Sequence, residues 1–142
     1  MPRDPDCIFC KIIDGAIPSM KVYEDAAAYA FLDIGPLADG HLLLIPKDHH
    51  ERLDTMSPEL LGQVTRLLPA LARALVDVTG AAGYNVLQNN GRLAGQVVMH
   101  VHFHLIPRQA QDGLGYRWNA GQYPPGRAEQ LRQALQAALN PP

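Results

Sequence analysis

The spacing of apolar residues along the chain predicts strands and helices. Short apolar runs bounded by turn residues are typical of strands, and they occur at 22–25, 29–33, 41–46, 84–88 and 98–107. Apolar residues spaced three and four apart predict helices over 7–14, 58–79 and about 127–139. This order indicates an α+β fold, with an antiparallel sheet of about five strands and the long helix on one face.

The segment 58–79 has the most regular helical pattern. Ser57 suits the N-cap and Pro58 the first helical position, and Gly80 is a suitable C-terminal cap. Pro69 lies inside the pattern, where its ring removes one hydrogen-bond donor and clashes with the previous turn. We therefore expect the helix to be kinked or split at this proline.

The end of the chain differs from the rest. From residue 109 the sequence is glycine-bearing and loop-like, and the final helix has mostly alanine on its apolar side, with Leu131, Leu135 and Leu139. We expect this helix to dock only weakly. With no internal repeat, we expect one domain over 1–142, with a core over about 7–118 and a C-terminal extension over 119–142.

Composition excludes several function classes. The net charge is −2 and the pI is about 6.3, so no global positive field attracts nucleic acid. No apolar run reaches the roughly 18 residues of a membrane span, and the N-terminus has no apolar stretch of signal-peptide type. We expect a cytoplasmic protein with neither nucleic acid nor membrane as a partner.

Three histidines, His100, His102 and His104, alternate along the predicted strand 98–107. Side chains alternate along a strand, so the three rings would share one face with neighbours roughly 7 Å apart. Such a row can arise by chance on a polar face, or it can bind zinc or copper. The third interpretation is nucleophilic or acid–base chemistry, in which histidine works near its own pKa.

The two cysteines, Cys7 and Cys10, form a Cys-x-x-Cys motif. Two cysteines are no disulfide framework, and in a cytosolic chain this spacing is typical of a redox or a zinc site. A thioredoxin-like site needs a surrounding βαβ pattern, which is missing. Zinc needs two further ligands, and histidines are available at 49, 50 and 100. Two reduced cysteines without metal remain the alternative.

Several blocks together resemble the histidine-triad (HIT) nucleotide hydrolases and transferases. The blocks occur in the family's order, at CIFCKII (7–13), FLDI (31–34), GHLLLIPK (40–47), NNG (89–91) and GQVVMHVHFHLIPR (95–108). The resemblance covers about 7–118, and the bacterial branch with paired cysteines, similar to nucleoside phosphoramidate hydrolases, is closest. It implies a HIT-like fold and cleavage at the α-phosphate of adenosine phosphoramidates, adenylates or dinucleoside polyphosphates.

The resemblance also implies a role for each histidine of the row. His102 would attack phosphorus and form a nucleotidyl-histidine, which water then hydrolyses, because neutral imidazole is a nucleophile at pH 7. His100 and His104 would bind phosphate oxygens or position the ring. His41 would support the row. No organic cofactor is implied, and the substrate would be a purine nucleotide.

The remaining site residues follow from the same resemblance. Asp33 would contact the ribose hydroxyls. The phosphate side of the pocket would be formed by Asn89, Gly91, Gly95 and Gln96, and the apolar slot for the base by Ile8, Phe9, Ile12, Ile17 and Ile34. Structural zinc would be bound by Cys7, Cys10, His49 and His100, with His50 as the substitute for His49.

One position departs from the family pattern. Val97 stands where the family carries serine or threonine, and losing that hydroxyl contact would cost roughly 1–3 kcal/mol of transition-state binding. This favours a second hypothesis, a nucleotide-binding module with little turnover. A third hypothesis is a hydrolase with water on zinc, which requires an open metal position.

The resemblance further implies a homodimer through 58–79 and a strand, with Trp118 near the partner's active site.

Overall fold

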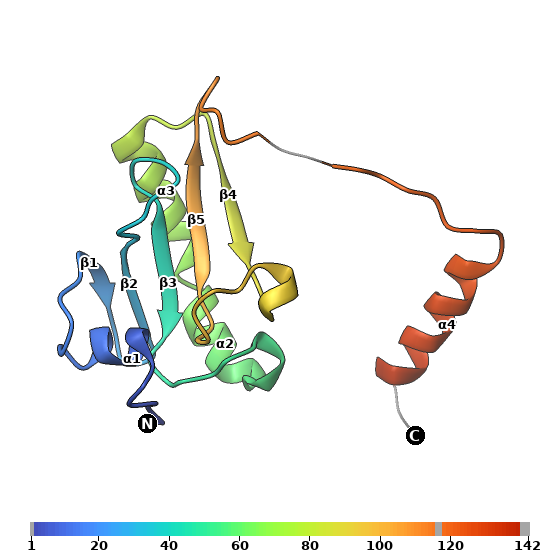
Figure 1. Ribbon diagram of the computed structural model, residues 1–142, viewed down its shortest axis with the longest axis horizontal. Coiled ribbons are helices and arrows are strands. Elements are labelled where there is room, and N and C mark those ends of the chain that lie inside the picture. The colour runs from blue at the N-terminus through green and yellow to red at the C-terminus, as the bar shows by residue number, and fades with distance from the viewer. Residues whose placement is uncertain (1, 116–117, 140–142) are drawn as a thin grey trace.

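One five-stranded antiparallel sheet organises the molecule, and its strand order is β1-β2-β3-β5-β4. The structure is a computed structural model and describes residues 2–115 and 118–139. The strands are β1 (Lys21–Glu24), β2 (Ala28–Leu32), β3 (Leu42–Pro46), β4 (Gly83–Gln88) and β5 (Phe103–Arg108). The helices are α1 (Ile8–Ile13), α2 (Pro58–Thr65), α3 (Leu68–Thr79) and α4 (Arg127–Leu139), with short 3-10 turns at η1 (Leu53–Thr55) and η2 (Arg92–Ala94). The predicted α+β class is confirmed (Figure 1).

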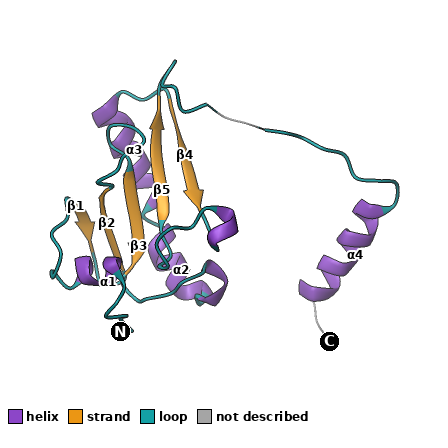
Figure 2. Cartoon of the chain, in the orientation of Figure 1, coloured by secondary structure: helices purple, strands orange, loops and turns teal. Residues whose placement is uncertain are grey.

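Both faces of the central strands are covered. Alternate residues of β2 and β3, such as Ala30 and Leu44, pack under α2 and α3, while Phe31 and Leu43 pack under α1. Two small cores therefore form, one on each side of the sheet (Figure 2). Strands buried on both faces read as continuous apolar runs, which explains the uninterrupted apolar sequence of β3.

The long predicted helix is split at Pro69, as expected. α2 ends at Thr65 and α3 begins at Leu68, so the proline occupies the first turn of a new helix, where a missing N–H costs nothing. The Ser57 side chain accepts a hydrogen bond from the Leu60 N–H at 3.1 Å and caps α2. The segment thus accommodates Pro69 by forming two helices instead of one.

The last predicted strand is shorter than the sequence pattern indicates. β5 begins at Phe103, and the preceding segment leaves the sheet. There the Val101 N–H bonds to the His50 carbonyl at 2.7 Å instead of to a neighbouring strand. Of the three alternating histidines, only His104 lies on a strand, opposite Leu43 on the α1 face. The expected strand is therefore too long, although the rings still lie on the α1 face: Phe9 packs against His100 and His102, and His104 lies beside His102.

The C-terminal helix lies apart from the rest of the molecule. Figure 1 shows α4 separated from the sheet by an extended segment that begins at the end of β5. None of the residues of α4, all of which the structure describes, is buried. None of the helices in the described part of the chain combines the length and the apolar character that a membrane span requires.

Gly40 tests the packing of the loop before β3 against α3. Its φ is +91°, and a Cβ there would lie 2.9 Å from both Leu75 Cδ1 and Thr79 Cγ2. We expect Gly40→Ala to lower the free energy of unfolding by about 1–3 kcal/mol, because backbone strain and overpacking add. The matched control is Gly62→Ala within α2, where a Cβ meets open space and alanine is the better helix former. Urea unfolding measures both; equal effects would contradict this account.

Candidate active site and metal centre

His100 is fully buried and uses both of its ring nitrogens. Its Nε2 lies 2.8 Å from the Pro46 carbonyl oxygen, which can only accept, so Nε2 carries the proton. The lone pair therefore sits on Nδ1. That atom faces the Cys7 and Cys10 sulfurs at 3.4 and 3.6 Å and the His49 Nδ1 at 3.2 Å. His100 thus points into a cluster of cysteine and histidine side chains rather than along a row of rings.

The cluster of Cys7, Cys10, His49 and His100 fits a single zinc ion. Its ligand atoms lie within 4.8 Å of one another, and the contacts of His100 with the other three and of Cys10 with His49 run from 3.2 to 3.6 Å. Four tetrahedral ligands at zinc bond lengths lie about 3.3–3.8 Å apart. The donor set, two thiols and two imidazoles, is one that structural zinc uses.

Further contacts support the ligands of this cluster. The Pro46 carbonyl orients His100, and Asp4 Oδ2 lies 3.8 Å from His49 Nε2, as outer partners of zinc-bound histidines do.

Burial raises the pKa of the Cys7 thiol to about 11, so the thiolate needs a cation nearby to form at neutral pH. A divalent metal supplies that charge.

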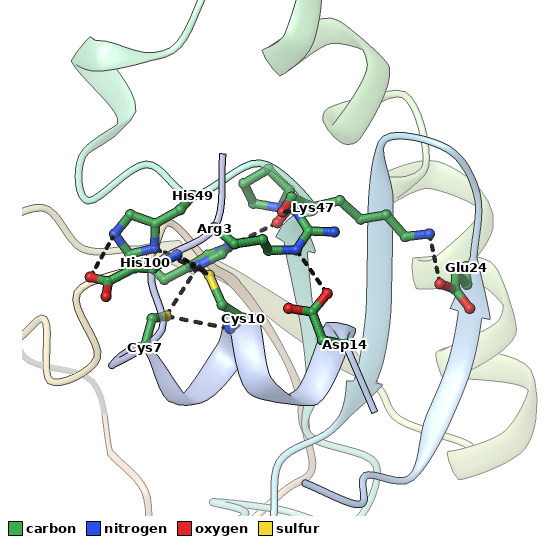
Figure 3. Close-up of polar contacts among 10 residues, drawn as sticks. Arg3, Cys7, Cys10, Asp14, Glu24, Lys47, His49 and His100 are labelled. Atoms are coloured by element: carbon green, nitrogen blue, oxygen red, sulfur yellow. Dashed lines mark hydrogen bonds and ion pairs between the residues drawn. The ribbon is translucent and has the colours of Figure 1, made fainter. Parts of the chain in front are cut away.

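Three chain segments far apart in sequence converge on this cluster (Figure 3). Cys7 caps α1, and its sulfur accepts the Cys10 N–H at 3.4 Å, so the first turn of the helix presents both sulfurs. His49 follows β3, and His100 precedes β5. Arg3 reaches the other end of α1, where it pairs with the C-cap residue Asp14 at 3.1 Å, and it also bonds to the Lys47 carbonyl.

His102 is oriented by the backbone of His100. Its Nδ1 lies 2.7 Å from the His100 carbonyl oxygen, so Nδ1 carries the proton and Nε2 keeps its lone pair. Phe9 packs its ring edge-to-face against both imidazoles, at centroid distances of 5.2 Å to His102 and 5.8 Å to His100. Burial lowers the pKa of His102, so the ring is neutral at pH 7 and Nε2 is available as a nucleophile.

His104 is oriented by a chain of hydrogen bonds from the loop before β3. The Leu37 N–H donates to His41 Nδ1 at 3.0 Å, so the proton of the neutral His41 ring sits on Nε2. That atom lies 2.9 Å from His104 Nδ1, which leaves the proton of His104 on its own Nε2. Asp33 Oδ2 is 3.6 Å from His41 Nε2. Asp33, His41 and His104 also group closely enough to hold a cation, and the hydrogen bond between the rings accounts for their closeness.

The rings of His102 and His104 lie side by side, with centroids 4.9 Å apart. Burial, together with neighbouring His102 and His41, lowers the pKa of His104 to about 4, so this ring is also neutral at pH 7. His102 thus offers a lone pair and His104 an N–H donor. A neutral nucleophile beside a donor suits attack on an anionic phosphoryl group.

Gln96, predicted to face the phosphate, holds the neighbouring loop in shape. It is buried, its Oε1 accepts the Gly91 N–H at 2.8 Å, and its Nε2 donates to the carbonyls of Glu51 and Val98. Gly95 has φ +97°, and a Cβ there would lie 3.6 Å from Asn89 Nδ2. The Asn89 amide therefore approaches the backbone at Gly95 closely, while the Gly95 N–H, which donates to the Arg92 carbonyl at 3.0 Å, and the Gln96 side chain are both occupied.

The apolar residues predicted for the base slot divide into two groups. Phe9 and Ile12 are buried on the sheet-facing side of α1, and Ile17 packs partly buried against the same cluster, whereas Ile8 is 46% and Ile34 92% exposed. Only the exposed pair is free to meet a ligand without rearrangement.

The structure also places three further residues that the sequence singled out. His50 bonds to Thr55 instead of facing the cysteines. The side chains of Val97 and Trp118 are exposed at 82% and 76%.

Sequence reasoning missed the partners that fix the imidazole protons. The carbonyls of Pro46 and His100 and the N–H of Leu37 are backbone groups, so no side-chain pattern could have indicated them. The one residue whose place in the sequence indicated such a partner was Pro46. It ends β3 beside the cysteine cluster, and its carbonyl oxygen accepts the His100 Nε2–H.

Comparisons with known proteins agree with this geometry. Residues 14–111 match the sequence model of the HIT domain. The chain is 47% identical over 125 residues to the adenosine 5'-monophosphoramidase HNT1 of Candida albicans, covering 84% of this chain and 82% of that protein. A crystal structure of a HIT family member from Bacillus subtilis superposes with a TM-score of 0.91 at 43% identity, over 96% and 99% of the two chains. A zinc-bound histidine triad family protein from Mycobacterium smegmatis matches with a TM-score of 0.73 at 36% identity, over 94% and 95%.

Proposed function

The chain belongs to the histidine-triad (HIT) family, and we propose that it hydrolyses adenosine nucleotides at the α-phosphate through a nucleotidyl-histidine at His102. The single observation that carries this proposal is the 2.7 Å contact between His102 Nδ1 and the His100 carbonyl, which leaves Nε2 unprotonated. The name of the Candida albicans relative supports adenosine phosphoramidates as the substrate class.

The reaction proceeds in two displacements at phosphorus. His102 Nε2 attacks the α-phosphorus and forms an N–P bond, while the leaving group departs with the electron pair of its own bond and takes up a proton from solvent, which the water of the second step returns. The ring then carries a positive charge, which the Nδ1–H bond to the His100 carbonyl stabilises. His104 donates its Nε2–H to a phosphoryl oxygen. Water next attacks phosphorus, breaks the N–P bond and releases the nucleoside monophosphate with the imidazole restored.

The proposed substrate contacts surround this pair of rings. Asp33, beside His41, accepts hydrogen bonds from the ribose hydroxyls, and the amide of Asn89, beside Gly95, faces the phosphate. Exposed Ile8 and Ile34 offer apolar surface to the base. His100, whose ring faces the cysteines, acts on the reaction through its carbonyl and not by binding phosphate.

We assign a structural zinc ion to the cluster of Cys7, Cys10, His49 and His100. A zinc ion with four protein ligands cross-links the chain segments that bind it and has no open coordination position for water. This disfavours the zinc-hydrolase alternative. His100 would thereby be held at two points, by the metal cluster and by the Pro46 carbonyl. The Mycobacterium smegmatis relative, described as zinc-bound, supports the choice of metal.

We also propose a homodimer formed through the edge of β4 and the helices. β4 is an edge strand of the sheet, and its apolar side chains Tyr84, Val86 and Leu87 are 44–46% exposed. An edge of this kind pairs readily with a second strand.

The adduct at His102 is the test of the proposed chemistry. Incubation with an adenosine phosphoramidate, acid quenching and mass spectrometry should find adenylate attached to His102. We expect His102→Ala to lose the adduct and to lower the hydrolysis rate at least about 10³-fold, because the nucleophile is gone. His50→Ala, which removes a histidine outside the site, should keep both. Tight nucleotide binding without adduct or product would instead favour a binding module. Exposed Val97 suggests this alternative because valine lacks the serine or threonine hydroxyl of the family.

Metal analysis tests the zinc assignment. Purified protein should contain about one zinc per chain, and Cys10→Ala should reduce this to near zero and lower the melting temperature, since one of the four ligands is lost. His50→Ala is the matched control, because His50 neighbours the ligand His49 but faces Thr55. Equal zinc content in the wild type and Cys10→Ala would refute the site.

A further inference from the structure

The segment before α1 lies against the cysteine cluster. Residues 2–6 form no helix or strand, and Pro2, Pro5 and Asp6 are exposed. Figure 3 shows the side chain of Arg3 extended from this segment past the cluster toward Asp14. We call residues 2–4 the N-terminal strap, because hydrogen bonds fasten them at several points although they bury little surface of their own.

The strap bonds to three of the four residues of the cluster. The Asp4 N–H donates to the Cys10 sulfur at 3.4 Å, and the Cys7 N–H donates to the Asp4 carbonyl at 3.1 Å. The His49 N–H donates to the Pro2 carbonyl at 2.9 Å, and the ring Nε2 of His49 lies 3.8 Å from Asp4 Oδ2. These bonds all end on residues that we assign as zinc ligands, so the strap is built around the metal site.

Arg3 fastens the strap to the two elements that flank the cluster. Its Nη1 donates to the carbonyl of Lys47, directly after β3, and its Nε pairs with Asp14, the C-cap residue of α1, at 3.1 Å. A guanidinium suits this task because it presents several donors in one rigid plane. The bond to the carbonyl is partly buried and charge-assisted, so it stabilises the closed strap more than the exposed pair with Asp14 does.

The ligand side chains have almost no contact with solvent. Cys10 is 1% exposed, His100 0% and Cys7 8%. A metal ion bound among them can leave only when part of the surrounding chain moves away. α1 is held by Phe9 and Ile12, which are buried in a hydrophobic cluster, whereas the strap has few buried apolar contacts. Segments of the second kind open at the lowest free energy, so the strap is the part that opens first.

We propose that the N-terminal strap is a gate on the metal site, and that Arg3 is the positioning residue that holds the gate closed. Opening of residues 2–4 releases the bonds to Cys10 and His49, and zinc exchanges with the solution only from this open state. The inference rests on the proposed zinc site and deepens it, because it identifies what sets the rate of zinc loss. Since His100 orients His102 through its carbonyl, a closed gate also protects the geometry of the nucleophile.

Zinc release to a chelator measures the gate. The zinc-loaded full chain is mixed with an excess of a chromogenic chelator, and the absorbance of the zinc–chelator complex gives the release rate. The wild-type rate should reach a plateau as the chelator concentration rises, because opening of the strap limits release. Arg3→Ala should raise this plateau at least about tenfold, since a charge-assisted hydrogen bond is lost. Lys11→Ala, which removes an exposed cation on α1, is the matched control and should leave the plateau unchanged.

Two results of this experiment would overturn the gate. A wild-type rate that rises in proportion to chelator over the whole range would show that the chelator reaches the metal without any opening. Equal plateaus in the wild type and Arg3→Ala would show that Arg3 does not hold the strap. A purified chain that neither contains nor takes up zinc would remove the proposed metal site and the gate with it, whereas adduct formation at His102 would still test the proposed chemistry.

Amide hydrogen exchange of the zinc-loaded chain identifies the segment that opens. The His49 N–H bonds to the strap, whereas the Val101 N–H bonds to the His50 carbonyl at 2.7 Å, beside the same cluster. Arg3→Ala should speed exchange at His49 at least about tenfold and leave exchange at Val101 unchanged, because only the strap is loosened. Faster exchange at both amides would mean that the whole site loosens, and unchanged exchange at His49 would mean that the strap stays closed. Either result contradicts the proposal.

Discussion

The site depends on one hydrogen bond, from His102 Nδ1–H to the carbonyl oxygen of His100. A carbonyl can only accept, so the bond decides which nitrogen of His102 carries the proton and which keeps its lone pair. It also aims the ring, because the carbonyl belongs to a residue that is itself fully buried. Backbone geometry thus leaves the lone pair of His102 on Nε2, and burial keeps the ring neutral by lowering its pKa.

The same residue ties the nucleophile to the cysteine cluster. The ring of His100 faces Cys7 and Cys10, while its carbonyl faces His102. Phe9, which lies between the two cysteines in sequence, packs against the rings of both histidines. The N-terminal helix therefore influences His102 by two routes, although 93 residues separate Cys7 from His100. The cysteine cluster and the rings of His102 and His104 form one packed unit at one face of the sheet.

The sequence predicted the strands, the split helix and the ligands that meet at the cysteine cluster, because periodicity and residue type carry that information. It failed where tertiary contacts override periodicity. The pattern over 98–107 predicts one strand. The first half of this segment leaves the sheet instead, because the Val101 N–H bonds to the His50 carbonyl and because His100 is buried. The ring of His100 consequently faces the cysteines, while the rings of His102 and His104 stay side by side with centroids 4.9 Å apart. Proton positions were also beyond prediction, since backbone partners fix them.

The central claim is that His102 is held as the Nδ1-protonated tautomer with a free Nε2. Nitrogen-15 NMR of the histidine rings at pH 7, with His102 assigned from the loss of its signals in His102→Ala, reports this directly. We expect a protonated Nδ1 and an Nε2 with the shift of an unprotonated nitrogen. A His102 ring that is protonated at Nε2, or at both nitrogens, would contradict the account.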